Sequence, residues 1–340
     1  MVKTEIPENL MRQMRSTVVL AGALLGRFKK VTFSYPGGCD IGSRPIDLHL
    51  AAFRKMGIQI EENSGFIRCS CDKIQAADIN LDFPSVGATE NIILAATLAE
   101  GTTTINNAAM EPEIADLANC LNRMGAKVRG AGTNIVKITG VKKLSEIGYK
   151  VMPDRIEAGT FLCAAAITGG KIKINNVVPE HIVPVIYKLQ EAGCIINTGK
   201  KFVGIEAPKK LKALEIKTMP YPGFPTDLQQ IFGSMLTLAR GTSIIIENIF
   251  ENRFKYTSEL IRLGAKITIE GKTAIITGKR KLNGTTVCGS DLRGGAGLII
   301  AGLAAKGITK VENIDYVLRG YENLNGKLNT LGAKIKEVGE

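Results

Sequence analysis

The apolar positions of the chain repeat at a nearly constant interval, and each repeat closes a helix-like stretch in the same way. Ile46, Leu50, Phe53 and Gly57 fall at positions i, i+4, i+7 and i+11, which form one face of an α-helix. The closing pattern "RKMGIQI" recurs as "NRMGAKV", "QEAGCII", "IRLGAKI" and "NTLGAKI". From the first closing glycine to the last, Gly57, Gly125, Gly193, Gly264 and Gly332, the intervals are 68, 68, 71 and 68 residues. The chain is therefore predicted to contain five copies of one module.

Each module is predicted to contain two helices and several strands. Its first helix, such as "TENIILAATLAEG", ends at a glycine that stops the helix in the left-handed conformation. We expect these stop glycines to be Gly26, Gly101, Gly169 or Gly170, Gly241 and Gly307. A strand follows in which apolar side chains alternate, as Val31, Phe33 and Tyr35 do, and the second helix and a further strand complete the module. Because such an α/β module cannot bury its apolar faces alone, we expect a few modules to gather around a shared core of helices.

Length and composition indicate a globular protein of two domains. The chain has 340 residues, 45% hydrophobic and 22% charged, and no apolar run approaches the roughly 20 residues that span a bilayer. Its first residues do not read as a signal peptide, and its seven cysteines show no paired CxxC spacing. With only two histidines, the sequence argues against a disulfide framework and against a metal site. We therefore expect a cytoplasmic protein that does not contact a membrane.

The formal net charge of +12 leaves two classes of anionic partner open. Nucleic acid is one, but the basic residues are scattered and aromatic residues make up only 5% of the chain. The densest basic stretches, "APKKLKALEIK" and "TGKRKL", are typical of solvated faces. A positive field that attracts small phosphorylated substrates explains the charge equally well, and we predict no nucleic-acid partner.

Polar residues stand in an ordered way at the predicted helix starts. Ser85, Thr89, Asp154 and Asp291 suit capping of free backbone N–H groups, which needs no functional explanation. Capping does not explain arginine, because a cation at a helix N-terminus faces the positive end of the helix dipole unless an anion lies between them. Several such arginines predict a site for phosphate or carboxylate, with surface salt bridges as the alternative. The arginines concerned are Arg15, Arg44, Arg155, Arg253, Arg293 and Arg319.

Asp227 lies in "YPGFPTDLQQ", where two prolines and a glycine constrain the chain just before a helix. A constrained aspartate can act as a general base toward a hydroxyl group. It can equally be the N-cap of the helix, and the sequence does not decide between these two roles.

Cys39 is the cysteine for which packing is the least convincing explanation. It lies in "SYPGGCDIGSRPIDLHL", after Pro36 and two glycines and before Arg44 and His49, whose charges could shift its pKa. We expect an exposed loop that presents Cys39 as a nucleophile or a general acid. Among the other cysteines, we expect Cys120, Cys163 and Cys194 to lie in the core, and Cys69, Cys71 and Cys288 to be packing or surface residues.

Together these residues resemble the UDP-N-acetylglucosamine 1-carboxyvinyltransferases, the enolpyruvyl transferases that open peptidoglycan synthesis. The resemblance runs from about Arg15 to the C-terminus. The matching stretches are "PGGCDIGSRPIDLH", "SVGATENIILAATLAEGTTTINNAA", "EPEI", "PDRIEAGTF", "FPTDLQ", "FENRF", "SDLRGGAGLIIAGLAAKG" and "RGYE". The cysteine loop is the most specific of them, because the related enzymes that make 5-enolpyruvylshikimate-3-phosphate share the fold but lack this loop.

The resemblance implies an α/β fold of two inside-out α/β barrel domains, each of three modules, as in EPSP synthase. It implies transfer of enolpyruvate from phosphoenolpyruvate to the 3-hydroxyl of UDP-N-acetylglucosamine, with release of phosphate and with no metal or organic cofactor. Cys39 would protonate the enolpyruvyl methylene or form a covalent adduct, and Asp227 would take the proton of the sugar hydroxyl. Arg44, Arg293 and Arg319 would hold phosphoenolpyruvate. The nucleotide-sugar site would be lined by Arg15, Arg44, Pro45, Ile46, Asp47, Leu48, Phe83, Pro84, Ser85, Val86, Asp227 and Ile249.

The sequence departs from the family in its number of modules, five where the family has six. The module without a counterpart is the N-terminal one, which carries a lysine–asparagine pair that helps to bind the substrates. We expect an N-terminal domain at residues 1–152 with two modules and the cysteine loop, and a C-terminal catalytic domain at residues 153–340 with three. Phe83 also departs, because some relatives have a basic residue there. The alternative function is a non-catalytic short paralogue that binds UDP-N-acetylglucosamine or pairs with a full-length enzyme.

Overall fold

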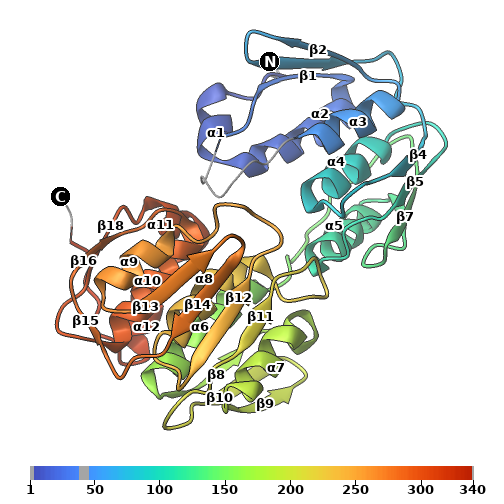
Figure 1. The fold of residues 1–340 in the computed structure, drawn as a ribbon. Helices are drawn as coiled ribbons and strands as arrows, with labels where there is room; N and C mark the ends of the chain where they lie inside the picture. The colour runs from blue at the N-terminus through green and yellow to red at the C-terminus, as the bar shows by residue number, and fades with distance from the viewer. Residues whose placement is uncertain (1–3, 38–45, 339–340) are drawn as a thin grey trace. The chain divides into compact units, whose positions relative to one another are not determined.

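The computed structural model describes residues 4–37 and 46–338, which form two compact units (Figure 1). Residues 4–37 and 46–152 belong to the first unit and residues 153–338 to the second. Each unit has a hydrophobic core of its own. Within the described residues, no helix is both long enough and apolar enough to cross a membrane.

The first unit contains two sheets and two central helices. One sheet is antiparallel in the order β1-β3-β2; the other has the order β4-β5-β7-β6, with β4 parallel to β5. Helices α2 and α4 approach closely, because Gly22 and Gly26 of α2 lie against the backbone of α4. In chain order the elements are α1 (Glu8–Gln13), η1 (Arg15–Val19), α2 (Leu20–Phe28), β1 (Lys30–Ser34), α3 (Asp47–Lys55), β2 (Gln59–Asn63), β3 (Phe66–Ser70), β4 (Asp78–Asn80), α4 (Val86–Ala96), β5 (Thr102–Asn106), α5 (Pro112–Arg123), β6 (Lys127–Arg129) and β7 (Ile135–Thr139).

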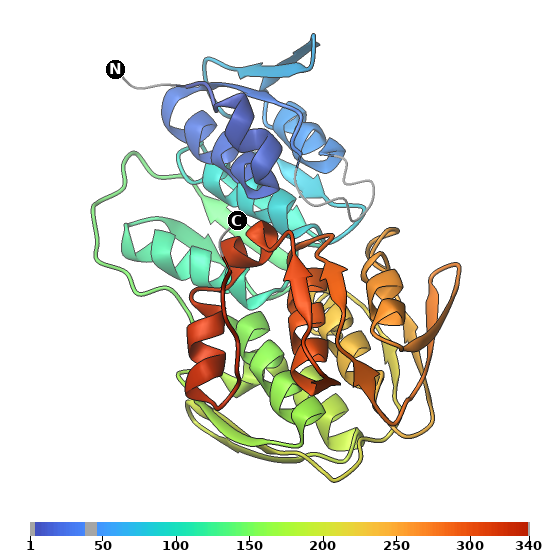
Figure 2. The same ribbon diagram turned by 90° about the vertical axis from the view of Figure 1, so that its left-hand side faces the viewer.

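The second unit places three helices, α6, α8 and α10, at its centre (Figure 2). All residues of α8 are buried, as expected for a helix that is enclosed on every side. The surrounding sheets have the orders β8-β10-β9, β11-β12-β14-β13, β15-β17 and β16-β18. The elements are α6 (Arg155–Thr168), β8 (Lys171–Asn175), η2 (Pro179–Ile182), α7 (Val183–Glu191), β9 (Ile195–Gly199), β10 (Phe202–Glu206), β11 (Glu215–Lys217), η3 (Thr226–Leu228), α8 (Gln229–Leu236), β12 (Thr242–Ile246), α9 (Tyr256–Arg262), β13 (Lys266–Glu270), β14 (Thr273–Thr277), β15 (Leu282–Asn283), β16 (Thr286–Cys288), α10 (Leu292–Ala304), β17 (Ala305–Lys306), β18 (Lys310–Glu312), α11 (Asp315–Gly320) and α12 (Leu324–Thr330).

The five closing glycines end their helices with one backbone geometry. After α3, the N–H of Gly57 bonds to the carbonyl of Arg54, and the N–H of Ile58 bonds to the carbonyl of Phe53, both at 3.0 Å. This pair of hydrogen bonds is the Schellman motif, which needs a positive φ at the glycine. The same pair of bonds follows α5, α7, α9 and α12. The prediction of a closing glycine is thus confirmed at Gly57, Gly125, Gly193, Gly264 and Gly332, whose φ angles are +77°, +101°, +98°, +95° and +99°.

The stop glycines of the first helices follow the prediction less uniformly. Gly169 is the left-handed C-cap of α6, while Gly101, Gly241 and Gly307 have positive φ in the connections to the next strands. Gly26 was wrongly predicted: it lies inside α2, and Lys29 takes the left-handed position instead. Glycine is present at this position for packing and not to stop the helix, because a side chain at Gly26 would come within 3.0 Å of the carbonyl oxygen of Leu94 on α4.

The fifth repeat differs from the others at its end. The sequence predicts a strand after Gly332, but described residues 333–338 form none. In the first four repeats this strand pairs within a β-hairpin, as β13 does with β14. Because strands are stabilised by their neighbours, a β-compatible sequence that finds no partner strand remains irregular.

Candidate active site

Aspartate side chains cap the starts of two central helices of the second unit. Asp154 accepts hydrogen bonds from two backbone N–H groups of the first turn of α6, at 2.7 and 3.0 Å. Asp291 accepts two in α10, both at 3.1 Å, and a further pair from the side-chain amide of Gln230 at 2.9 and 3.0 Å. The capping prediction is confirmed at both positions, and the bond to Gln230 joins the starts of α8 and α10.

In the first unit, the capping prediction is confirmed at Ser85 and wrong at Thr89. Ser85 caps α4 by accepting a bond from the N–H of Ala88 at 3.3 Å, as predicted. Thr89 does not cap the helix, because α4 begins at Val86 and Thr89 already lies in its first turns. Its hydroxyl donates to the carbonyl of Ser85 at 2.8 Å and accepts from the N–H of Ala109 at 3.1 Å.

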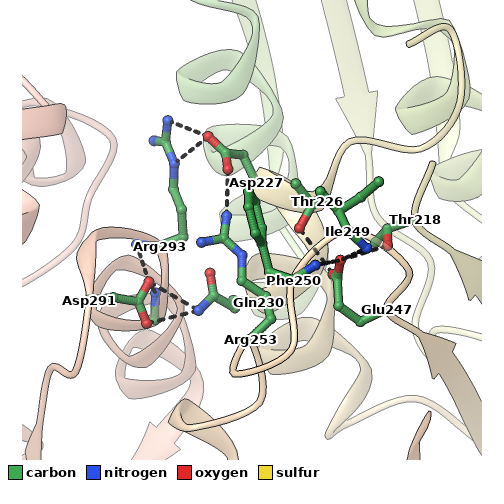
Figure 3. Close-up of polar contacts among 11 residues, drawn as sticks. Thr218, Thr226, Asp227, Gln230, Glu247, Ile249, Phe250, Arg253, Asp291 and Arg293 are labelled. Atoms are coloured by element: carbon green, nitrogen blue, oxygen red, sulfur yellow. Dashed lines mark hydrogen bonds and ion pairs between the residues drawn. The ribbon is translucent and has the colours of Figure 1, made fainter. Parts of the chain in front are cut away.

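Asp227 is held between two arginines (Figure 3). Arg253 donates from Nη2 to Oδ1 at 2.5 Å, and Arg293 donates from Nε and Nη2 to Oδ2 at 3.3 and 3.2 Å. The carboxylate lies in η3 and makes no capping bond to η3 or α8, so the N-cap alternative for Asp227 is wrong. Its side chain remains 40% exposed, which leaves it accessible to a second molecule.

The electrostatics of this cluster keep Asp227 ionised. The surrounding protein would raise the pKa of the carboxyl, but the charges of Arg293 and Arg253 outweigh that effect and lower the pKa to about 2. In return, Asp227 raises the pKa of Arg293 despite the opposing effect of burial. One carboxylate between two guanidinium groups leaves a net charge of +1, which favours a further anion.

Both arginines are fixed in place yet retain unused donors. Arg293 lies over the ring of Tyr321 at 5.3 Å, and Arg253 lies over the ring of Phe250 at the same distance. The Nε of Arg253 and the Nη1 of Arg293 are buried and have no hydrogen-bond partner within the protein. Because buried donors are normally satisfied, these two N–H groups are suited to a bound anion or water.

The other predicted arginines that the structure describes occupy two kinds of position, the start and the end of a helix. Arg155 begins α6 and lies over the ring of Tyr221 at 5.6 Å, and Arg15 begins η1. Arg319 was predicted at a helix start but lies in the last turn of α11, because that helix begins earlier, at Asp315. A cation is favourable there, since the C-terminal end of a helix dipole is negative. The helix-start argument therefore does not apply to Arg319.

Three segments of the predicted nucleotide-sugar site in the first unit lie near one another. Arg15, Ile46 and Asp47 line one pocket, and Leu48 packs against the core beside them. Phe83 is 44% exposed and precedes the start of α4 at Ser85 and Val86. Pro84 completes that segment and is half-buried.

Asn91 connects these segments from inside the core. Its Oδ1 accepts from the N–H of Gly22 at 2.6 Å, and its Nδ2 donates to the carbonyl of Val18 at 3.1 Å and to Nδ1 of His49 at 2.7 Å. Helix α4, which carries Asn91, is thereby tied to η1, α2 and α3. Since Nδ1 of His49 accepts, its proton lies on Nε2. Burial, then the charge of Arg15, lower the pKa of His49 to about 4, so the imidazole is neutral at pH 7.

Cys39, Arg44 and Pro45 lie outside the described residues. Of the other cysteines, Cys163 and Cys194 are buried, as predicted, whereas Cys120 is only half-buried. Cys69 is buried, Cys71 half-buried and Cys288 exposed, and all six are free thiols. The described part of the chain holds no cluster of three or more His, Cys, Asp or Glu residues suited to a metal ion.

Sequence reasoning did not assign a role to three site-forming residues. Arg253 was predicted at a helix start, but it precedes α9, which begins at Tyr256, and it was not named as a ligand of phosphoenolpyruvate although "FENRF" was among the matching stretches. Asn91 and Glu247 were not singled out, because a single amide or carboxylate in an apolar stretch carries no local signal. Their buried positions and long-range partners identify them only in the folded chain.

Comparison with known proteins places the chain in a family. Residues 1–328 match the family described as EPSP synthase (3-phosphoshikimate 1-carboxyvinyltransferase). UDP-N-acetylglucosamine 1-carboxyvinyltransferase 2 of Caldanaerobacter subterraneus subsp. tengcongensis is 55% identical over 336 residues, which are 98% of this chain and 81% of that protein. UDP-N-acetylglucosamine 1-carboxyvinyltransferase 1 of Carboxydothermus hydrogenoformans is 54% identical over 98% of this chain and 79% of that protein.

Solved structures share the fold at lower identity. The enolpyruvyl transferase NikO from Streptomyces tendae matches with a TM-score of 0.86 and 24% identity, over 98% of this chain and 80% of that one. EPSP synthase from Acinetobacter baumannii matches with a TM-score of 0.71 and 19% identity, over 94% and 78%. The α/β fold is thus that of the enolpyruvyl transferases. With the family match and relatives above 50% identity, this chain belongs to the EPSP synthase family and is a UDP-N-acetylglucosamine 1-carboxyvinyltransferase-type member of it.

Proposed function

We propose that the chain transfers enolpyruvate from phosphoenolpyruvate to the 3-hydroxyl of UDP-N-acetylglucosamine, the first committed step of peptidoglycan synthesis. The observation that carries this proposal is Asp227 held between Arg253 and Arg293, an exposed carboxylate beside two unused guanidinium donors. The names of relatives that are 49–55% identical support it and favour an enzyme over a non-catalytic paralogue.

Phosphoenolpyruvate would bind to the arginines. Its phosphate and carboxylate match the bidentate geometry of guanidinium groups, and Arg293, Arg319 and Arg44 are the proposed ligands. Arg253 joins this set, because its free Nε is one of the two buried donors without a partner.

Asp227 would become basic when phosphoenolpyruvate arrives. With a pKa of about 2, the clamped carboxylate is a weak base. A dianionic substrate that shares the two guanidinium groups reduces their effect on Asp227 and adds negative charge nearby, and both changes raise its pKa. Asp227 can then take the proton of the sugar 3-hydroxyl as its oxygen attacks the substrate.

Cys39 would complete the reaction at the neighbouring carbon. As the hydroxyl oxygen adds to C2 of phosphoenolpyruvate, Cys39 donates a proton to C3, giving a tetrahedral intermediate. Loss of a proton from C3 and departure of phosphate from C2 then restore the double bond. Proton donation and electrostatic clamping supply this chemistry, so we expect no metal or organic cofactor.

The proposed ligands of UDP-N-acetylglucosamine are those that the family resemblance implies. Arg15, Ile46 to Leu48 and the segment from Phe83 to Val86 are the proposed ligands in the first unit. Asp227 and Ile249 are the proposed ligands in the second. The pocket lined by Arg15, Ile46 and Asp47 supports this assignment.

We further propose two domains, residues 1–152 with the cysteine loop and residues 153–340 with the catalytic aspartate. Asp116 of the first unit holds the hydroxyl of Tyr149 at 2.8 Å and the N–H of Met152 at 3.4 Å, whereas Asp154 caps α6 of the second, which supports a boundary at Pro153. The five repeats would correspond to five of the six modules of the family, and we expect the enzyme to act in the cytoplasm.

The test combines turnover with covalent labelling. The purified chain is given UDP-N-acetylglucosamine and phosphoenolpyruvate, and release of phosphate and the mass of the product are measured. A second sample receives UDP-N-acetylglucosamine and fosfomycin, the epoxide that alkylates the loop cysteine of the family. We expect a mass adduct that Cys39→Ser abolishes. A folded chain that neither binds UDP-N-acetylglucosamine nor forms the adduct would contradict the proposed function.

A further inference from the structure

Glu247 is a buried carboxylate whose hydrogen-bond donors come from three parts of the second unit. It follows β12 and is only 1% exposed. Its Oε1 accepts from Thr218 Oγ1 at 2.9 Å and from the N–H groups of Ile249 and Phe250 at 2.8 and 3.2 Å. Its Oε2 accepts from Thr226 Oγ1 at 3.0 Å (Figure 3).

These four donors are uncharged, which makes the choice of a carboxylate informative. Burying an ionised group is unfavourable unless hydrogen bonds compensate for its lost hydration. An apolar residue at the end of β12 would avoid that cost if the position served packing alone. A carboxylate, in contrast, can collect several donors at two oxygens and fix the segments that carry them.

The segments that Glu247 joins are those that carry the active-site groups. Thr226 immediately precedes Asp227, and Phe250 supports the guanidinium of Arg253 through its ring at 5.3 Å. Thr218 anchors the assembly to the core: it is fully buried, and its Oγ1 and carbonyl oxygen accept from Asn248 at 2.9 and 3.0 Å. One carboxylate therefore reaches both sides of the pair formed by Asp227 and Arg253.

We infer that Glu247 is a positioning residue, which sets the separation of Asp227 and Arg253 and the path of the backbone at Ile249. This inference rests on the proposed function for the roles of Asp227 and Ile249. The geometry itself, a single buried acceptor that bridges residues 226 and 249–250, is independent of that function.

Three substitutions separate the parts of this arrangement. Glu247→Ala removes both oxygens and frees both segments. Glu247→Gln keeps one carbonyl oxygen for the donors of Oε1, and its amide can donate to the Thr226 hydroxyl, which then accepts. Thr226→Val breaks only the bond toward Asp227. Glu270→Ala, at an exposed carboxylate at the end of β13, is the matched control.

Hydrogen–deuterium exchange of the full chain measures the positions directly, without relying on activity. For Glu247→Ala we expect exchange to rise at least about tenfold in peptides covering both 224–229 and 248–254, the factor that corresponds to loss of one to two hydrogen bonds. Thr226→Val should affect 224–229 alone, and Glu270→Ala neither peptide. Glu247→Gln should stay close to the unsubstituted chain.

Calorimetric titration with UDP-N-acetylglucosamine provides the functional readout. The Kd should rise at least about tenfold in Glu247→Ala and less than about threefold in Glu247→Gln. If exchange rises evenly across the second unit, or if only 248–254 responds to Glu247→Ala, the positioning role is refuted. If Glu247→Ala does not fold, Thr226→Val decides, because an unchanged 224–229 would refute the bridge. If the unsubstituted chain does not bind the nucleotide sugar, the proposed function fails, while the exchange data still decide the role of Glu247.

Discussion

At the scale of single residues, the site is organised around charges that do not cancel. The carboxylate of Asp227 neutralises one of the two guanidinium charges, so one positive charge is left over. Aromatic rings and the surrounding protein keep both guanidinium groups in place. Arg253 is 3% exposed and Arg293 13%, so neither can move into water to relieve the repulsion between them. The aspartate is thus part of the structure of the site as well as a proposed catalytic group.

Replacing Asp227 with Asn should therefore lower both activity and stability. The amide keeps the shape but not the charge, leaving two nearly buried cations together. We expect the free energy of unfolding to fall by about 2 kcal/mol, less than for a fully buried ion pair because Asp227 is 40% exposed. Transfer activity should fall at least roughly 100-fold through loss of the base.

Urea denaturation and phosphate release measure the two effects, with Asp315→Asn at an exposed helix start as the control. Full stability in Asp227→Asn would show that the carboxylate does not hold the two arginines together.

At the scale of elements, the closing turns show which features a sequence reveals. A Schellman turn depends on about six consecutive residues and demands one unusual backbone angle, so a glycine after a helix reports it directly. The prediction for Gly26 was wrong because this glycine packs against α4, a helix that is distant in the sequence. The prediction for Arg319 was wrong because α11 begins at Asp315, which places Arg319 in the last turn of the helix. Local chemistry is therefore predictable, whereas contacts between elements are not.

Substituting Gly125 tests the cost of the backbone angle alone. A Cβ at Gly125 meets no atom within 4 Å, but its φ of +101° is unfavourable for an L-residue. Gly125→Ala should lower the free energy of unfolding by about 1–2 kcal/mol. Gly148 is equally open but lacks a positive φ, so Gly148→Ala should change it by less than about 0.5 kcal/mol.

The two alanine variants are compared by urea denaturation under the same conditions. Equal effects at the two positions would mean that the left-handed geometry contributes nothing measurable.

At the scale of the whole molecule, repetition is what made the fold predictable. Five similar stretches of sequence indicate modules, and apolar spacing indicates which face of a helix is buried. The clamp on Asp227 was beyond that reasoning, because Arg253 and Arg293 come 26 and 66 residues later and from other elements. Nothing in a single stretch says which of several arginines will meet a given carboxylate. The composition predicted an anionic partner, and only the folded chain shows where positive charge is concentrated.

The first unit as a whole should show two opposing pH dependences. His49 has its pKa lowered to about 4, so its contribution to stability is complete above pH 6.5 and is lost as the pH falls toward 4. Glu90 has its pKa raised to about 7, by burial and then by Glu113 and Glu111, so its contribution is complete below pH 4.5 and is lost as the pH rises toward 7. Each amounts to about 3 kcal/mol, and between pH 4.5 and 6.5 they offset one another.

Single variants should separate the two effects. In His49→Gln, stability should fall as the pH rises from 4.5 to 6.5, and in Glu90→Gln it should rise over the same range. Denaturation midpoints at several pH values provide the measurement, with the unsubstituted chain expected to be nearly flat. Parallel profiles for the two variants would rule out these assignments.

The five closing turns also make the molecule sensitive to handedness. A φ between +77° and +101° is the mirror image of an angle that L-residues prefer. A D-amino acid therefore adopts the backbone conformation of each closing glycine without strain. At Gly125, which is exposed, D-alanine should therefore stabilise the fold by restricting the unfolded chain, while L-alanine destabilises it. Identical atoms would act with opposite sign, and the chain offers that comparison once in every module.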